Sequence, residues 1–387
     1  MISGQWLVVS CQWAVARVQW LVISGQWPAL QSIFEPLVSA PITDHCSLRY
    51  NQAMQVVAQH EPATSETSAS GRELSVLVSG CGVYRADRSL FQITGRDRVR
   101  WLNGMVSNNV RDLTAGHGVY AFVLNPQGNI RGDLYVFNRG ESLVAEIERG
   151  QSESLLQILR KYIIMDKVEI EDLGENILAI AGPKSGEVLA SLGLSAELGS
   201  LQLFDVNWNG STLTLVRGDN PSSPSYELWV PAEKGESVWN ALLQAGAVEV
   251  HEETLETFRI LSGIPKVGQD IRERTLPQET GQERALNFNK GCYIGQEIVE
   301  RVRSRGAVHR TFVGFELEGT LPAAGTKVQS EGKDVGEITS VAAQPLKGRR
   351  LAVGYLRREF LIGAKPLTAS GAQMKATTLP FLDLLKT

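Results

Sequence analysis

Residues 118–148, GVYAFVLNPQGNIRGDLYVFNRGESLVAEIE, contain three extended apolar runs that are separated by two turns. The turns are Asn125-Pro126-Gln127-Gly128 and Asn138-Arg139-Gly140, and both have the residue types that tight turns favour. The stretch therefore predicts three successive antiparallel strands. Segments with helical periodicity flank it, over residues 97–106 and 152–163. Antiparallel meanders that alternate with helices indicate an α+β chain and not a doubly wound parallel sheet.

The same pattern continues beyond the meander and then changes. Residues 213–216 and 226–230 have strand character, and residues 234–245 and 253–262 have helical character. From Thr311 onward, short runs broken by glycine predict a small all-β barrel or sandwich. We therefore expect three folded domains, two α+β domains over residues 81–200 and 201–306 and a β-barrel over 307–387.

The N-terminal residues carry a repeat of a different kind. Gln-Trp recurs with a period of seven, at positions 5–6, 12–13, 19–20 and 26–27. The repeat lacks the charged flanking positions of a coiled coil, the basic start of a signal peptide and the unbroken apolar run of a membrane helix. We interpret residues 1–53 as a spurious or disordered repeat upstream of an initiator at Met54, and residues 54–80 as a disordered linker.

Composition excludes several classes of protein. The net charge of -4 and the isoelectric point near 5.9 argue against nucleic-acid binding through bulk charge, so we expect no direct nucleic-acid contact. The four cysteines form no CxxC pair and the five histidines are isolated, which predicts neither a disulfide framework nor a metal site. We expect a cytoplasmic protein that does not contact a membrane.

Residues 290–297, KGCYIGQE, are the most unusual short motif of the chain. Gly291 frees the backbone on one side of Cys292, and Lys290 together with a helix start near Gly295 favours thiolate over thiol. A thiolate here is a nucleophile, a metal or cluster ligand, or a redox sensor, whereas a structural cysteine remains the alternative. Asp133, at a strand start, is either a hydrogen-bond partner for a heteroaromatic amine, a general base or an exposed acid.

A second feature near the motif is a row of arginines. Arg301, Arg303 and Arg305 alternate, so they share one face if the segment is extended. Such a row suits a partner rich in carboxylate or phosphate, and a merely solvated face is the alternative.

The stretch from Ile264 to Gly314 resembles the YgfZ family, which comprises folate-binding relatives of the glycine-cleavage T-protein that support iron–sulfur cluster assembly or repair. KGCYIGQE is similar to that family's signature, and LPQE (276–279) matches the element before it. GMVSNNVRDL and YAFVLNPQGNIRGDLYVF look like the N-terminal folate-binding domain that both relatives share. GKDVGEITS and LAVGYLRR resemble their C-terminal barrel. The resemblance covers residues 84–360 and implies a three-domain ring of two α+β folate-binding subdomains and the barrel.

Three departures separate the chain from T-proteins, which typically have K-x-D-F-I-G with aspartate at the position of Cys292. They also have an Asp-Asp pair where this chain has Gly132-Asp133, and an asparagine where it has Glu146. The resemblance therefore favours the cluster-maintenance branch over aminomethyl transfer.

The family pattern implies a tetrahydrofolate pocket. Asp133 is expected to approach the pterin, and Tyr120, Leu124, Asn125 and Glu227 are expected beside it. Cys292 is expected to be the essential thiol facing the same cavity, with Lys290 as its activator. The remaining motif residues are Gly291, Tyr293, Gly295, Gln296 and Glu297, of which the last two are expected to form a polar shell.

The implied function is a tetrahydrofolate-dependent accessory protein for iron–sulfur enzymes, including those that modify tRNA, and its implied partners are client enzymes or cluster-assembly factors. The alternatives are an aminomethyltransferase of glycine cleavage and a folate-binding regulator without chemistry.

Overall fold

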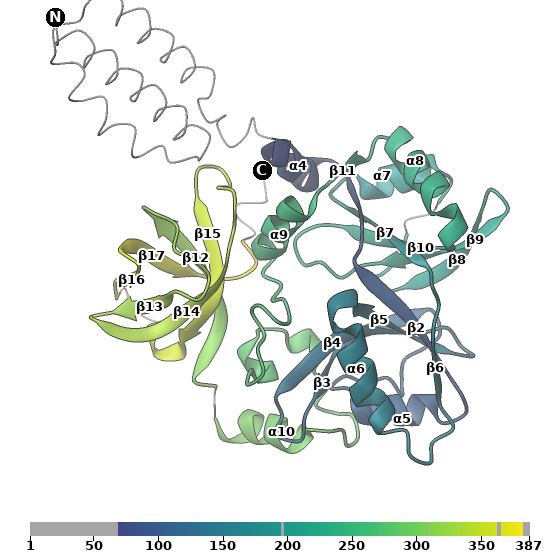
Figure 1. The fold of residues 1–387 in the computed structure, drawn as a ribbon, viewed down its shortest axis with the longest axis horizontal. Coiled ribbons are helices and arrows are strands. Elements are labelled where there is room, and N and C mark those ends of the chain that lie inside the picture. Colours follow the sequence, from purple (N-terminus) through teal and green to yellow (C-terminus); the bar gives the residue numbers. More distant parts are fainter. Residues whose placement is uncertain (1–68, 195–196, 307, 362–364, 382–387) are drawn as a thin grey trace, which may run out of the picture. The chain divides into compact units, whose positions relative to one another are not determined.

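The computed structural model describes residues 69–194, 197–306, 308–361 and 365–381. These residues form two α+β domains and a β-barrel, whose elements are labelled in Figure 1. The predicted α+β class with a C-terminal barrel is confirmed. The repeat at residues 1–53 lies outside the described residues.

The first sheet contains the meander that the sequence predicted. Its strand order is β3-β4-β5-β2-β6 and every pairing is antiparallel. Its strands are β2 (Arg88–Thr94), β3 (His117–Leu124), β4 (Ile130–Asn138), β5 (Leu143–Glu148) and β6 (Glu169–Asp172). Helices α5 (Arg98–Met105) and α6 (Arg149–Lys161) bury apolar side chains with one face of this sheet. The other face, which carries Tyr120, Asp133 and Tyr135, is left for the site.

The second sheet has the order β11-β1-β7-β10-β9-β8. Its strands are β1 (Gly82–Arg85), β7 (Asn176–Ala181), β8 (Leu203–Trp208), β9 (Ser211–Arg217), β10 (Ser225–Val230) and β11 (Val248–Glu249). Helices α7 (Ser185–Ser191) and α8 (Gly235–Gln244) pack on it. An apolar cluster that includes Leu90, Phe137 and Trp229 joins the two sheets.

The predicted boundary between the α+β domains at residue 200 is wrong. Strand β1 pairs with β7, with Gly82 opposite Ala181, so both strands belong to the second sheet. The chain therefore starts the second domain, leaves it to build all of β2–β6, and returns at β7. A division into consecutive segments cannot capture a pairing between strands so far apart in the sequence.

The predicted disordered linker over residues 54–80 is also wrong in its last part, because Ala69–Ser79 form helix α4. Leu74 and Leu77 lie three positions apart and are buried against α9 (Glu252–Leu261) and the barrel. The polar residues around these two leucines led to the prediction of disorder, whereas burial of the short apolar stripe stabilises the helix.

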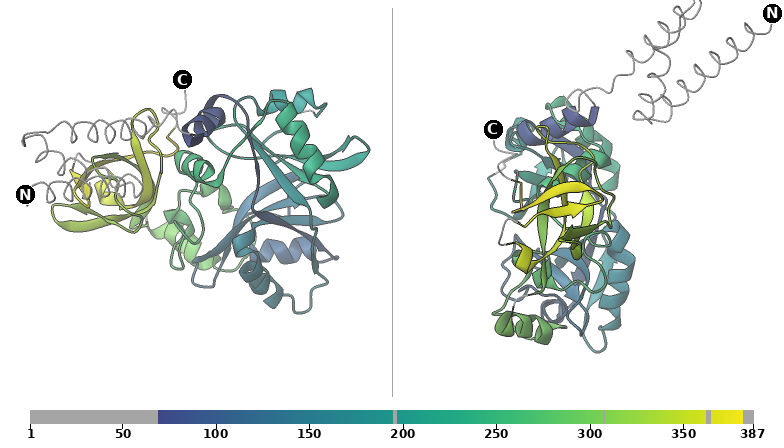
Figure 2. Two further views of the ribbon diagram at one scale, coloured as in Figure 1. Left: turned by 45° about the horizontal axis from the view of Figure 1, so that its top comes forward. Right: turned by 90° about the vertical axis from the view of Figure 1, so that its left-hand side faces the viewer.

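The C-terminal domain is a closed barrel with the order β12-β15-β14-β13-β16-β17, and the left view of Figure 2 shows its strands curving around on themselves. An apolar core fills the barrel. The strands are β12 (Arg310–Glu318), β13 (Lys327–Ser330), β14 (Lys333–Val341), β15 (Arg350–Arg357), β16 (Leu367–Ala369) and β17 (Ala372–Thr377). Between α9 and the barrel, residues 262–309 contain the short 3₁₀ helices η2 (Pro277–Glu279) and η3 (Glu283–Ala285) and then α10 (Gln296–Arg305). Two more 3₁₀ turns are η1 (Ala232–Lys234) and η4 (Arg358–Phe360).

Candidate functional site

A cavity of about 480 Å³ lies between the two sheets and is closed on one side by α9 and the loop after it. Strands β2–β5 supply one wall, and β7, β9 and β10 supply another. Its lining has more acids than bases. The carboxylates are Asp133, Glu146, Glu148, Asp219, Glu227, Glu252 and Glu256, and the cations are Arg88, Arg259 and Lys266. Such a cavity suits a ligand that offers hydrogen-bond donors.

Arg88 lies between two of these carboxylates. Its Nη1 atom is 2.5 Å from Glu146 Oε1 and 3.3 Å from Glu227 Oε1. The Glu146 side chain is 1% exposed, so this acid depends on Arg88 for its neutralisation. Burial, and then the nearby charge of Glu146, raise the pKa of Glu227 to about 8. Glu227 thus holds its proton more tightly than an exposed glutamate does.

Asp133 is held at the cavity wall by two neighbours. The Tyr120 hydroxyl donates to its Oδ2 atom at 2.6 Å, and Gln151 Nε2 donates to its Oδ1 atom at 2.9 Å. Burial raises the pKa of Asp133, and the bond from Tyr120 opposes the shift. The carboxylate is therefore partly buried, oriented and within reach of a ligand in the cavity.

Gly132, where T-proteins carry the other aspartate of the pair, points away from the cavity. A Cβ atom built there lies 2.7 Å from the Leu155 side chain of α6. Neighbouring residues on a strand face opposite sides, so this position belongs to the apolar helix layer. The cavity accordingly has a single carboxylate at this point of β4.

Tyr135 and Tyr120 connect this wall of the cavity to the 3₁₀ segment that contains Arg284. The Tyr135 hydroxyl donates to Asp219 Oδ1 at 2.9 Å, and Asp219 forms an ion pair with Arg284. The Arg284 guanidinium lies 4.2 Å from the centre of the Tyr120 ring. Arg284 does not line the cavity itself, but it packs on the ring of Tyr120, which does.

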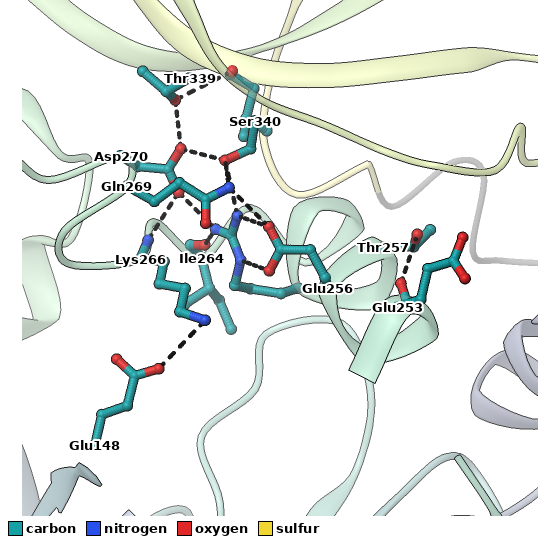
Figure 3. Close-up of polar contacts among 12 residues, drawn as sticks. Glu148, Glu253, Glu256, Thr257, Ile264, Lys266, Gln269, Asp270, Thr339 and Ser340 are labelled. Atoms are coloured by element: carbon teal, nitrogen blue, oxygen red, sulfur yellow. Dashed lines mark hydrogen bonds and ion pairs between the residues drawn. The ribbon is translucent and has the colours of Figure 1, made fainter. Parts of the chain in front are cut away.

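The remaining wall is fixed by a buried polar network around Asp270, which is drawn in Figure 3. Arg259 donates to Asp270 at 2.8 Å and binds Glu256 with two nitrogens. Thr339 and Ser340 of β14 also donate to Asp270. The barrel thereby anchors the loop whose Lys266 lies 3.6 Å from Glu148 of β5.

The KGCYIGQE loop lies elsewhere. None of its eight residues lines the cavity, so the expectation that Cys292 faces the pocket is wrong. The loop packs instead on the end of α5 and on the β3–β4 hairpin. The backbone N–H of Ile294 donates to Gly104 O, and Gly295 adopts a φ of 83° against Asn125 O, where a Cβ would be 2.6 Å from that oxygen. Glycine is therefore required at position 295.

Lys290 is buried and anchors this loop. Its ammonium donates to the carbonyl oxygens of Asn103, Val106 and Asn108 at 2.6–2.7 Å, which are orphan acceptors at the end of α5. Burial, aided by the charge of Arg111, lowers the pKa of Lys290 to about 7. An ammonium has three donors, and all three are used here. Lys290 thus has no donor left for Cys292, and its expected role as activator of the thiol stays a prediction.

The other motif residues divide into exposed and packed ones. Cys292 is a free, exposed cysteine, whereas Tyr293 is buried in an apolar cluster with Phe122 and Leu124, where burial raises its pKa to about 12. Gln296 and Glu297 begin α10, with Glu297 exposed in the first turn. The Cys292 thiol is therefore exposed, whereas neighbouring residues of the motif are packed against the rest of the protein.

Three of the five residues expected in the folate pocket, Asp133, Tyr120 and Glu227, line the cavity. Leu124 and Asn125 do not, because Leu124 packs in the apolar cluster and the Asn125 side chain accepts from the Asn129 N–H in the hairpin turn.

The segment with the arginine row is helical and not extended. Arg301 and Arg303 lie on helix α10, where residues two apart point to different sides. The shared face that an extended segment would give them is therefore absent.

Sequence reasoning missed Arg88 and Tyr135 as residues of the cavity, and Arg284 as a neighbour of Tyr120 outside it. Nothing in the sequence next to Arg88 or Arg284 distinguishes them from surface arginines, because their partners Glu146 and Tyr120 are far away in the sequence. Glu146 was noted only as a departure from T-proteins, although an acid inside the otherwise apolar strand LVAEIE is itself a signal of a buried pair. Tyr135 could have been found from its alternation with Asp133 on the same strand face.

Two negative findings concern the described residues only. Among them, no group of three His, Cys, Asp or Glu side chains is placed to hold a metal ion. None of their helices combines the length and apolarity that a membrane-spanning helix needs.

Comparison with known proteins places this architecture. The GCVT N-terminal domain family matches residues 47–290, which is more than half of the chain, and the chain belongs to that family. The β-barrel matches the CAF17 C-terminal beta-barrel domain over residues 309–382.

Individual relatives are more distant. An aminomethyltransferase of Rippkaea orientalis is 29% identical over 284 residues, which are 70% of this chain and 76% of that protein. A chloroplastic protein of Arabidopsis thaliana, named only as a transferase, is 25% identical over 72% of this chain and 66% of its own length. The crystal structure of aminomethyltransferase T of the glycine cleavage system from Bartonella henselae shares the fold, with a TM-score of 0.73 and 21% identity over 81% of this chain and 89% of that one.

Proposed function

We propose that the chain binds a reduced folate in the cavity between its two sheets and uses Cys292 to support the maintenance of iron–sulfur enzymes. The observation that carries the folate part is Asp133, a partly buried and oriented carboxylate beside aromatic side chains. A pterin offers adjacent ring and amino N–H groups, which pair with one carboxylate through two parallel hydrogen bonds. Tyr120 and Tyr135 supply ring faces in the same cavity.

The residues present fit this ligand. Glu227 of β10 adds an acceptor from the opposite wall, and Glu146 of β5 adds one from the same wall as Asp133. The acid excess of the lining matches a ring rich in N–H donors. Membership of the GCVT N-terminal domain family and the relatives named as aminomethyltransferases support a folate ligand in addition.

The cluster-maintenance part rests on the resemblance of KGCYIGQE to the YgfZ signature and on the exposure of Cys292. The CAF17-type barrel supports the same branch. An exposed thiol outside the ligand cavity is accessible to another protein, and we take that protein to be an iron–sulfur client enzyme or an assembly factor. A group that reacts with bound folate would need to lie inside the cavity.

Ligand binding is tested by titrating the full chain with 5-formyltetrahydrofolate. Asp133→Asn keeps the shape of the side chain but removes its charge, so we expect affinity to fall by about 10- to 100-fold. Asp172→Asn is the matched control, because Asp172 is exposed at the end of β6. An Asp133→Asn protein that binds as tightly as wild type would rule out this pocket.

The role of the thiol is tested by complementation of a cluster-maintenance defect. We expect Cys292→Ser to lose rescue although it folds and binds folate. Full rescue by that variant would falsify the assignment of Cys292 as the functional thiol.

A second candidate function is aminomethyl transfer, which the relatives named as aminomethyltransferases favour. Gly132 and Cys292, which replace the acids typical of T-proteins, speak against it. The decisive assay is formation of methylenetetrahydrofolate from an aminomethyl-lipoyl carrier protein. Turnover that depends on Asp133 and survives Cys292→Ser would favour this candidate over cluster maintenance.

A further inference from the structure

The ligand cavity and the Cys292 loop have no residue in common, yet both are bonded to one short segment. This segment, residues 103–108, contains the end of α5 and the turn after it. It is buried and polar: Ser107 is 0% exposed and Asn108 is 9% exposed. A buried segment that contacts two sites is a candidate for a connection between them.

On the side of the cysteine, hydrogen bonds join the segment to Lys290 and Ile294 of the loop and to Asn287 just before it. Lys290 donates to three of its carbonyl oxygens, as described above. The N–H of Ile294 donates to Gly104 O at 3.2 Å, and the N–H of Asn287 donates to Ser107 O at 3.1 Å. Cys292 is therefore bracketed by two residues whose positions this segment sets.

On the side of the cavity, Asn108 makes the connection. Its Nδ2 atom donates to Tyr120 O and to Arg284 O, both at 2.8 Å. Its own carbonyl oxygen accepts from Lys290 at 2.6 Å. One residue thus joins the strand that lines the cavity, the 3₁₀ segment of Arg284 and the anchor of the cysteine loop.

We propose that Asn108 and Arg284 are positioning residues that couple the ligand cavity to Cys292, so that a reduced folate bound in the cavity changes the reactivity of the thiol. This inference rests on the proposed function. It explains how a ligand serves a cysteine that lies outside its pocket.

The physical reason is the way in which Tyr120 is held. A ligand that donates N–H groups to Asp133 competes with the Tyr120 hydroxyl for that carboxylate, because the hydroxyl donates to Oδ2 at 2.6 Å. The Arg284 guanidinium is stacked 4.2 Å from the Tyr120 ring, so a shift of the ring displaces Arg284. The backbone of Arg284 is bonded to Asn108, and densely packed, satisfied polar groups transmit such a shift.

The test measures the alkylation of Cys292 by iodoacetamide with and without 5-formyltetrahydrofolate. Mass spectrometry of the Cys292 peptide separates this thiol from the other cysteines of the full chain. In wild type we expect the ligand to change the rate constant by about fivefold or more. In Arg284→Gln we expect the ligand to bind, since Arg284 does not line the cavity, and the rate constant to stay unchanged.

Arg303→Gln is the matched control. Arg303 lies on α10 and stacks 4.9 Å from the Phe288 ring, close to the same loop but outside the connection through Asn108. This variant should keep the wild-type response. Arg284→Lys keeps the charge opposite Asp219 without the flat stacking surface, and it serves as the second variant should Arg284→Gln fold poorly; we expect a reduced response from it.

The outcomes separate this inference from the proposed function. If wild type binds the ligand and the rate constant does not change, the coupling is refuted and folate binding stands. If wild type does not bind the ligand, both fall. A full response in Arg284→Gln and Arg284→Lys would exclude the route through Arg284 and overturn the inference.

Discussion

The cavity and the Cys292 loop use buried charge in opposite ways. In the cavity, the buried Glu146 and the partly buried Glu227 flank one arginine, and the number of acids leaves acceptors for a ligand. In the loop, the buried charge is a lysine whose donors are all used by backbone carbonyls, and only a thiol reaches the surface. The first arrangement is suited to binding and the second to presenting a group. The predictions below test this difference, from the largest expected effect to the smallest.

Removal of the anchor of the loop should have the largest effect on stability. Lys290→Met keeps the apolar stem but leaves three buried carbonyl oxygens without a donor, so we expect the free energy of unfolding to fall by about 4 kcal/mol. Denaturant unfolding at neutral pH measures this change. The control Lys161→Met replaces an exposed lysine and should stay within about 0.5 kcal/mol of wild type. Equal losses in both variants would show that Lys290 is not a cap.

Removal of the cation of the cavity should come next. Arg88→Met leaves Glu146 buried without its counter-ion, and breaking a buried pair in this way costs about 3 kcal/mol, at the lower end because the Arg88 side chain is 35% exposed. Arg149→Met, whose partner Asp87 is exposed, is the matched control and should lose little. Chemical denaturation of the two variants is sufficient. If Arg88→Met is as stable as wild type, the acid cluster does not depend on this arginine.

The sequence predicted one of these regions better than the other. Alternating apolar residues and turn chemistry around Asn125–Gly128 were enough for the meander, and thereby for the wall that carries Asp133. The family resemblance added Glu227. The role of Lys290 could not be predicted, because it depends on the end of α5 lying beneath a loop that is more than 180 positions away in the sequence. Pairing of β1 with β7 was missed for the same reason, since residues 82–85 have no local sign of their partner.

A smaller effect on stability, which depends on pH, is expected from Glu227 of the cavity. The folded-state pKa of Glu227 is about 8, above the ordinary 4.5, so the folded protein binds more protons than the unfolded chain between these values. Wild type should therefore lose stability as the pH rises from about 4.5 to about 8, and Glu227→Gln should remove at least about 1 kcal/mol of that loss. Thermal or denaturant unfolding across this pH range measures it, with the exposed Glu171→Gln as control. A Glu227→Gln curve parallel to that of wild type would mean that Glu227 titrates normally.

The smallest effect is expected at the residue that we propose to matter most for function. Cys292 is exposed and outside the cavity, so Cys292→Ser should leave the melting temperature and the folate affinity unchanged within about 1 °C and twofold, as substitutions at exposed positions usually do. The comparison with Lys290→Met is the informative one, because the two residues are neighbours in the motif and only one of them supports the fold. A tenfold loss of folate affinity in Cys292→Ser would mean that the thiol contacts the ligand. The cavity and the Cys292 loop would then no longer have separate roles. Unchanged affinity together with lost rescue would show that the thiol acts after the ligand is bound and on something other than the ligand.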